Sequence, residues 1–302
     1  MQVFYSDHLL VPLPAGHRFP MPKYARLHQR VAEACLPGVD LTASAPASDE
    51  QLLRVHNIDY LKRFLSGELT EREMRRIGFP WSPELVVRSR YAAGGTIDAC
   101  RAALPDGLAV NLAGGTHHAY PDHGEGYCVF NDVAVATRAM QAERLATRVV
   151  ILDCDVHQGN GTAVIFADDP TVFTFSVHGA KNFPFHKEQS DLDIALPDGS
   201  GDEAFLEAVR GGVTRAVELA QADLAIYIAG ADPFIGDRLG RLAMTMEGLA
   251  ERDRWVFEHC SQRSLPVAVV MGGGYARQAE DVVDIHQQTL WLAAQFASKR
   301  TA

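Results

Sequence analysis

Five short apolar runs, rich in Val, Ile and Leu, constrain the fold of this chain more than any other feature of its sequence. They occupy residues 108–115, 148–157, 171–178, 223–232 and 265–275. Near-continuous apolar runs are typical of strands that are covered on both faces, as in parallel sheets. Segments with helical spacing lie between them, including 131–148 and 202–220. The alternation predicts an α/β fold with a central, mostly parallel sheet and helices on both faces.

The rest of the chain gives no sign of a second domain. No repeat, low-complexity tract or linker interrupts the 302 residues, so a single domain over residues 1–302 is expected. The first ninety residues are less regular: a proline-rich loop covers 11–24, helical spacing covers 25–34, and "GFPWSP" at 78–83 is a second prolyl loop with Trp81 partly exposed.

Charge and cysteine content exclude several classes of protein. The formal net charge is −10 and no block of Lys or Arg occurs, which argues against a nucleic-acid partner. The five cysteines form no CxxC pair, so neither a disulfide framework nor a thiolate zinc site is expected. No apolar run approaches the length of a membrane span, and the first residues lack the pattern of a signal peptide. We therefore expect a cytoplasmic protein without membrane contact.

The second apolar run ends abruptly in "DCDVH", with Asp153, Asp155 and His157 at alternate positions. Residues two apart on a strand face the same side, and carboxylate and imidazole groups are ligands for Zn²⁺. Taken alone, the string is equally compatible with a helix-capping carboxylate and a hydrogen-bonded core histidine. Asp232 ends another of the runs and offers a further ligand. Because ligands bind at the carboxyl ends of parallel strands, this convergence favours a metal site with one position open to water.

Two further runs end in residues that are capable of acid–base chemistry. "GGTHH" places His117 and His118 after the first run, and "GGGY" places Tyr275 after the fifth. Adjacent histidines are common by chance, and glycines often serve only to make turns. At a strand end beside a metal site, however, the histidines become candidates for a general base and its electrostatic partner. Tyr275 becomes a candidate donor to a developing oxyanion.

The order and content of these motifs resemble the histone deacetylase superfamily of zinc-dependent lysine deacetylases. The matching strings are "GGTHHAY", "GYCVFNDVAVA", "DCDVHQGNGT", "AGADPFIGDRLGRL" and "MGGGY". Gln158 stands where most members carry a second histidine, and with "GDRLGRL" and "FPMPKY" it resembles the class IV branch. The resemblance implies a single arginase-like α/β domain.

The resemblance also implies roles for individual residues. Asp155, His157 and Asp232 would bind Zn²⁺, or Fe²⁺ in its place. His118 would be the general base, with His117 beside it to stabilise charge or protonate the leaving amine. Asp153 and Asn160 would accept hydrogen bonds from His117 and His118 respectively, and Tyr275 would polarise the substrate carbonyl. Asn160 in place of an aspartate should leave His118 less basic.

Two more sites follow from the resemblance. A monovalent cation, K⁺, would bind at backbone carbonyls of Asp155 and His157, the Asp153 carboxylate and Ser176. Tyr127 would form one wall of a channel for an alkyl-amine stem, although an ordinary core tyrosine is the alternative. The family's class I members grip the substrate backbone with an acidic residue in the loop that corresponds to "GFPWSP". This chain has no acid there.

The expected function is therefore zinc-dependent hydrolysis of an acyl group, acetyl or longer fatty acyl, from the side-chain amine of lysine in a protein or peptide. One alternative is deacetylation of a small acetylated amine such as an acetylpolyamine. Another is a non-catalytic acyl-amine binding module, although no expected ligand or catalytic residue is missing. An arginase-like two-metal site is disfavoured, because Gly159 stands where its second metal needs an aspartate.

Overall fold

The computed structural model describes residues 1–6 and 11–300, with side chains described as far as residue 297. The strands of this part of the chain form one sheet in the order β2-β1-β3-β8-β7-β4-β5-β6, and all neighbouring pairs are parallel. The strands are β1 (Gln2–Tyr5), β2 (Asp40–Ala43), β3 (Leu108–Asn111), β4 (Val149–Asp153), β5 (Val172–Gly179), β6 (Leu192–Leu196), β7 (Leu224–Ile228) and β8 (Val267–Val270).

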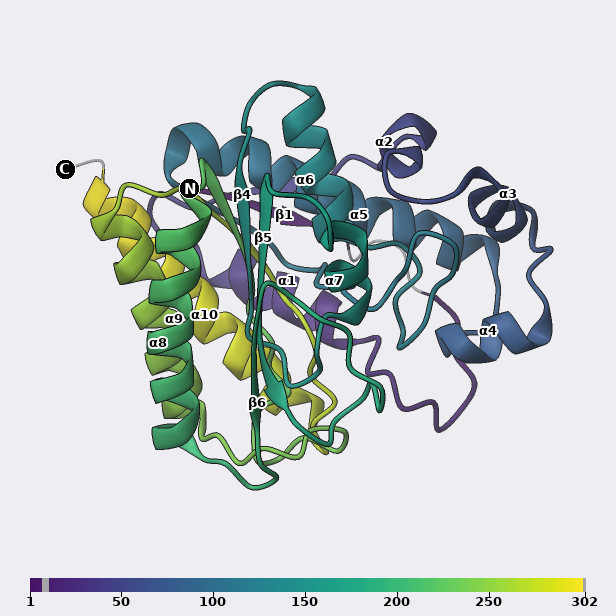
Figure 1. Ribbon diagram of the computed structural model, residues 1–302. Coiled ribbons are helices and arrows are strands. Elements are labelled where there is room, and N and C mark those ends of the chain that lie inside the picture. Colours follow the sequence, from purple (N-terminus) through teal and green to yellow (C-terminus); the bar gives the residue numbers. More distant parts are fainter. Residues whose placement is uncertain (7–10, 301–302) are drawn as a thin grey trace.

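Helices cover both faces of this sheet (Figure 1). One face packs against α1 (Lys23–Ala34), α8 (Asp202–Ala220), α9 (Met246–Gln262) and α10 (Ala279–Arg300). The opposite side carries α2 (Asp49–Leu53), α3 (Ile58–Ser66), α4 (Glu71–Ile77), α5 (Pro83–Asp106), α6 (Asp132–Ala142) and α7 (Asn160–Phe166). No helix in the described ranges combines the length and the apolar character needed to cross a membrane.

Strand β4 shows why the apolar runs are continuous rather than alternating. Val150 and Leu152 point into the core beneath α8 and α9, whereas Val149 and Ile151 belong to the core on the α5 and α6 side. Each of the four is at most 1% exposed. Both faces of the strand are therefore apolar, as is typical of a parallel sheet between two helical layers. The predicted α/β fold class is confirmed.

All five apolar runs contain a strand, and the polar residues singled out above lie in the last part of these strands or in the loops that follow them. The helical segment expected at 202–220 is α8 itself, while the one at 131–148 is shorter. There α6 ends at Ala142, and Arg144 adopts a left-handed backbone with φ 59°. The loop around Trp81 is present, with 36% of that residue exposed.

The first ninety residues are more regular than the sequence suggested. They contribute β1, β2 and most of the helices of the α5 side. The two strands are only four residues long, which is too short for a periodic pattern to be recognised. Helices α2 and α4 do carry a local signal: Ser48 with Gln51 and Thr70 with Glu73 form capping boxes at their first turns.

Candidate active site

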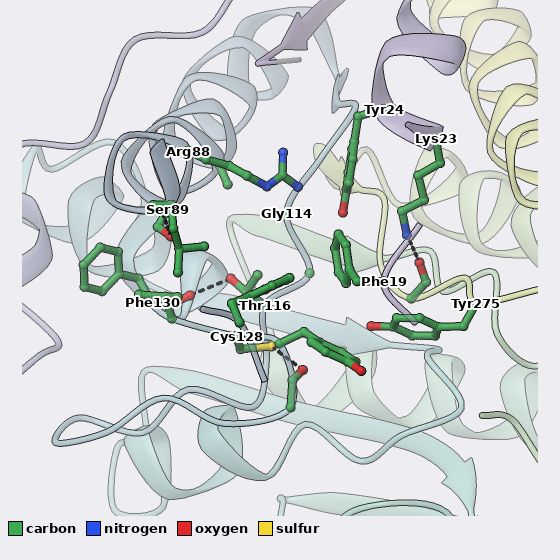
Figure 2. Close-up of a pocket in the computed structure, with 18 residues that line it drawn as sticks. Phe19, Lys23, Tyr24, Arg88, Ser89, Gly114, Thr116, Cys128, Phe130 and Tyr275 are labelled. Atoms are coloured by element: carbon green, nitrogen blue, oxygen red, sulfur yellow. Dashed lines mark hydrogen bonds between the residues drawn. The ribbon is translucent and has the colours of Figure 1, made fainter. Parts of the chain in front are cut away.

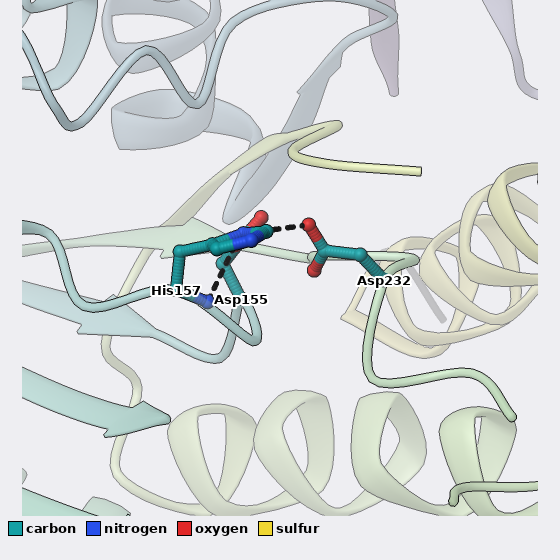
Figure 3. A group of neighbouring side chains, drawn as sticks. All are labelled: Asp155, His157 and Asp232. Atoms are coloured by element: carbon teal, nitrogen blue, oxygen red, sulfur yellow. Dashed lines mark hydrogen bonds and ion pairs between the residues drawn. The ribbon is translucent and has the colours of Figure 1, made fainter. Parts of the chain in front are cut away.

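The loops after β4 and β7 meet at the carboxyl edge of the sheet, because these two strands are neighbours. They bring together Asp155, His157 and Asp232, whose potential ligand atoms all lie within 4.8 Å of one another (Figure 3). His157 Nδ1 is 3.0 Å from Asp155 Oδ1 and 3.1 Å from Asp232 Oδ2. All three side chains are buried. The three residues expected to bind zinc therefore form one compact group.

The charge of this group fits a cation. Two carboxylates within one buried cluster repel each other, and burial together with Asp155 raises the pKa of Asp232. Burial lowers the pKa of His157, but its hydrogen bonds to the two carboxylates outweigh burial and raise it to about 10. Without a metal, a proton on His157 supplies the missing positive charge. One imidazole nitrogen and two carboxylate oxygens are the donor set that Zn²⁺ and Fe²⁺ accept in open sites.

The glycine-rich loop after β8 packs directly against this group. Gly273 has φ 56°, and a Cβ atom there would lie 2.2 Å from Asp232 Oδ2 and 2.7 Å from Asp155 Oδ2. Any other residue at this position would displace a carboxylate. The glycines thus allow the backbone to approach the carboxylates closely.

The two histidines after β3 lie next to the cluster and have different partners. His117 Nδ1 lies 2.6 Å from Asp153 Oδ2, and His118 Nδ1 lies 2.7 Å from Asn160 Oδ1. Both imidazoles are buried, and their ring centroids are 4.2 Å apart. The structure therefore pairs each histidine with a different residue of the segment that follows β4.

These partners give the histidines opposite protonation behaviour. Burial lowers the pKa of His117, but the carboxylates of Asp153 and Asp155 outweigh it and raise that pKa to about 9. Burial and the neighbouring His117 hold the pKa of His118 well below 6.5, and the Asn160 amide offsets only part of this. The two pKa shifts therefore favour a charged His117 beside a neutral His118. Two titratable groups separated in this way suit an acid and a base.

Behind Asn160 lies Glu125, a residue that the sequence did not single out. Asn160 Nδ2 donates to Glu125 Oε1 at 2.6 Å and to the Tyr120 hydroxyl at 3.1 Å. Arg76 Nε lies 3.2 Å from Glu125 Oε2. Because both amide hydrogens have acceptors, the amide oxygen must face His118. A glutamate between two glycines in a loop carries no local pattern that could have revealed this.

Tyr275 is buried and faces the cluster from the loop after β8. Its backbone N–H donates to Asp237 Oδ2 at 2.6 Å, and Asp237 Oδ1 accepts from the N–H groups of Leu239 and Gly240. Burial and the charge of Asp232 raise the pKa of the Tyr275 hydroxyl well above 10, so it stays protonated. Asp237 thus fixes the loop that carries a permanent O–H donor.

Aromatic rings form the walls leading to the site. Phe183 lies 4.9 Å from His118 between ring centroids, and Tyr127 lies 5.6 Å from Tyr275. A Cβ atom on Gly78 would lie 2.8 Å from the Tyr127 ring, so only glycine fits behind it. Tyr127 is half-buried, on the side of the site where the sequence placed a channel wall. Phe183 was not anticipated, because nothing in its local sequence distinguishes it from a core phenylalanine.

Ser176, predicted to bind a monovalent cation, lies on β5, the strand next to β4. Ser176 of β5 is in register with Asp153 of β4, and its hydroxyl lies 3.0 Å from His178 Nδ1. Gln158, at the position where a second histidine is usual, bonds to Asp193 and to both the N–H and the carbonyl of Glu188. Gln158 therefore anchors the 181–190 loop, which carries Phe183.

The groove outside the channel is basic although the chain is acidic overall. It has a volume of about 820 Å³, and His118, His157 and Tyr275 are part of its lining. Cationic side chains on its rim outnumber the single acid, Glu125; they are Arg18, Arg75, Arg76, Lys181, Arg238 and Arg241. Arg75, Arg76 and Arg241 form ion pairs with Glu71, Glu125 and Asp198, so among the described residues the excess positive charge comes from Arg18, Lys181 and Arg238. An excess of positive charge at the entrance favours anionic or acid-flanked ligands.

An inner cavity lies on the other side of Tyr275 and Gly273, between α1, α5 and the loops after β3 and β8 (Figure 2). Its volume is about 60 Å³, which is room for about four water molecules. Aromatic rings and glycine backbone make up much of the wall. Two cations, Lys23 and Arg88, also line it, and no acidic side chain of the described residues does.

Fold and site together define an α/β protein with a buried Asp-His-Asp group at the carboxyl edge of a parallel sheet. Residues 17–290 match the histone deacetylase domain family, so the chain belongs to the histone deacetylase family. An uncharacterized protein of Picosynechococcus is 46% identical over 94% of this chain and 95% of its own length. A histone deacetylase-like amidohydrolase of Pseudomonas aeruginosa is 30% identical over 88% of this chain and 74% of its own.

Solved structures share the fold at lower sequence identity. A histone deacetylase homologue from Aquifex aeolicus superimposes with a TM-score of 0.84 over 97% of this chain and 83% of its own, at 22% identity. The HDA15 HD domain superimposes with a TM-score of 0.81 over 97% of this chain and 90% of its own, at 21% identity. The match to the histone deacetylase domain family confirms the superfamily assignment made from the motifs, and these structures share the fold.

Proposed function

We propose that the chain is a metal-dependent amidohydrolase that removes an acyl group from the side-chain amine of lysine in a protein or peptide. One observation carries this proposal: His117, paired with Asp153, and His118, paired with Asn160, lie side by side near a buried Asp-His-Asp group, and Tyr275 lines the same groove as His118 and His157. Amide hydrolysis needs a base, an acid, an electrophile and an oxyanion donor, and this arrangement supplies each of them.

Asp155, His157 and Asp232 would hold the metal, Zn²⁺ or Fe²⁺. When bound, it would polarise the substrate carbonyl and lower the pKa of water to about 7. His118 keeps its Nδ1 proton on Asn160, so its Nε2 is free to take a proton from the attacking water. His117, charged beside Asp153, stabilises the negative charge that develops and protonates the leaving amine. The Tyr275 hydroxyl donates to the carbonyl oxygen as it becomes an oxyanion.

Asp153 and Ser176 are proposed to take part in a second site for K⁺, with the carbonyls of Asp155 and His157. The register of β4 and β5 supports this, because it sets the Asp153 and Ser176 positions side by side. A monovalent cation there would balance the Asp153 carboxylate and hold the loop that carries the metal ligands.

The entrance supports a peptide over a small cationic amine. Tyr127 and Phe183 both line the groove that leads to the site, and a passage between aromatic rings would suit the alkyl stem of lysine. The basic rim would repel an acetylpolyamine and attract a peptide with acidic residues beside the lysine. The inner cavity has room for a short acyl group, so acetyl is preferred to a long fatty acyl chain.

The test is hydrolysis by the zinc-loaded protein of matched acetyl-lysine and myristoyl-lysine peptides and of an acetylated polyamine. We expect turnover of the acetyl-lysine peptide that a chelator abolishes and zinc restores. Faster cleavage of the polyamine would favour the small-amine alternative. Binding without cleavage of any substrate would indicate an acyl-amine binding module.

A further inference from the structure

The inner cavity contains a cation, Arg88, for which the described residues supply no counter-ion. Arg88 extends from α5 towards Tyr24 and is only 8% exposed (Figure 2). Its guanidinium stacks over the Tyr24 ring at 4.2 Å, but it makes no hydrogen bond or ion pair within residues 1–6 and 11–297. A guanidinium has five N–H donors, and burying a charge without acceptors is strongly unfavourable.

A second buried cation faces the same cavity. Lys23 is 3% exposed, and its ammonium group donates to the carbonyls of Gly273 and Gly274 rather than to a carboxylate. Its Nζ lies 5.1 Å from the centroid of the Tyr24 ring, which therefore contacts both cations. Two positive charges without an acidic residue among the described lining side chains suit this cavity to an anion.

The position of the cavity indicates where such an anion would come from. Gly273 and Tyr275 form part of its wall and also pack against the Asp-His-Asp group on the other side. A substrate carbonyl at that group would direct its acyl chain into the cavity. A chain of about four non-hydrogen atoms would fill a volume that holds about four waters.

We propose that the acyl group removed by this protein is short and ends in a carboxylate, of malonyl or succinyl size, and that Arg88 binds this carboxylate. The inference rests on the proposed deacylase function. Water oxygen bonds to the amide carbon, the carbon–nitrogen bond breaks, and the nitrogen leaves as the lysine ammonium group. A neutral amide with one carboxylate thus gives one ammonium group and a dicarboxylate, so charge and atoms balance. Lys23 adds a second positive charge to the cavity, and its ammonium group holds the Gly273 backbone.

The test compares kcat/KM for succinyl-lysine and butyryl-lysine in one peptide sequence, with acetyl-lysine as reference. A charge-assisted hydrogen bond contributes about 1.5–3 kcal/mol, so succinyl should exceed butyryl by at least about tenfold in the zinc-loaded protein. The Arg88→Met variant should abolish this ratio, and Arg88→Lys should keep part of it. Arg101→Met is the matched control, because Arg101 lies on the same helix but pairs with Glu143 at the surface.

Cleavage of acetyl-lysine and butyryl-lysine with no preference for succinyl-lysine would overturn the inference and leave the proposed function standing. If no peptide is cleaved, the proposed function fails, and calorimetry still tests the cavity. Zinc-loaded Tyr275→Phe protein should then bind the succinyl peptide at least about tenfold more tightly than the butyryl peptide. Adding Arg88→Met should remove the difference. Equal affinities in Tyr275→Phe would show that the cavity does not recognise a carboxylate.

Discussion

The side-chain oxygen of Asn160 lies 2.7 Å from Nδ1 of His118, and the amide nitrogen of Asn160 donates in the opposite direction to Glu125 at 2.6 Å. An amide can turn either end towards an imidazole, but an acceptor behind it allows only one orientation. Glu125 therefore determines which nitrogen of His118 carries the proton. The tautomer of the proposed base depends on a residue that does not contact it.

Replacing Glu125 should lower turnover without weakening substrate binding. We expect Glu125→Ala to reduce kcat by about tenfold or more, in the range seen when partners behind site residues are removed, with KM little changed. Glu125→Gln keeps an acceptor oxygen and should recover much of the rate. ¹⁵N NMR of His118 should show the Nδ1-protonated tautomer in wild type and a mixture in Glu125→Ala. A single unchanged tautomer in that variant would rule out this role.

Tyr275→Phe should reduce kcat by about 100-fold, the usual effect of losing one oxyanion donor. Zinc content should remain at the wild-type level, because the hydroxyl lies outside the proposed ligand set. Steady-state kinetics and elemental analysis measure the two quantities on one preparation. An unchanged kcat would mean that another group stabilises the oxyanion.

Asp232→Ala should abolish zinc binding and activity together. The substitution removes one of three ligands and leaves His157 with a single carboxylate partner. Elemental analysis after dialysis gives the metal content, and Asp237→Asn, which lies in the same loop, serves as the comparison. Full zinc occupancy in Asp232→Ala would show that the third ligand lies elsewhere.

Acid should destabilise the protein through His56, away from the site. Burial lowers the pKa of His56 to about 4, and its two ring nitrogens bond to the Tyr120 carbonyl and to the Asn131 N–H. The neutral ring fits this pair, since a protonated Nε2 would face another donor. The folded pKa lies below the unfolded value of about 6.5, so the stabilisation is complete above pH 6.5 and is lost as pH falls towards 4.

The loss through His56 corresponds to about 3 kcal/mol over that interval. Urea unfolding of wild type and His56→Gln between pH 7 and pH 4.5 measures it. The variant should show a shallower decline in the free energy of unfolding. Parallel declines in the two proteins would assign the acid sensitivity to other groups.

The strands that carry the site were predictable because they are buried on both faces and lead into segments with polar residues. Each has a largely apolar pattern. The carboxylates after β4 and β7 would be unfavourable in a buried position unless they were paired or bound to a metal. Strand β6 was not predicted, because it is a half-exposed strand at the edge of the sheet and mixes polar with apolar residues. Its role is to position Asp193, which holds Gln158.

The parts of the site that escaped prediction depend on contacts between distant segments. Glu125 and Phe183 come from loops without periodic pattern, and their positions follow from packing alone. Nothing in the local sequence distinguishes Arg88 from an exposed arginine. The fold shows that its side chain is buried on α5. Local sequence records what a residue can do, whereas its partner is set by tertiary structure.

His157 and Asp232 are 75 residues apart in the chain and meet only when β4 and β7 pair in the centre of the sheet. The unfolded chain has no such group, so any cation that binds there binds the folded state alone. The free concentration of that cation would therefore enter the folding equilibrium directly. A bound metal would thus raise the free energy of unfolding as well as complete the site. Chains without the metal would unfold more often, and they would be degraded faster than chains that hold it.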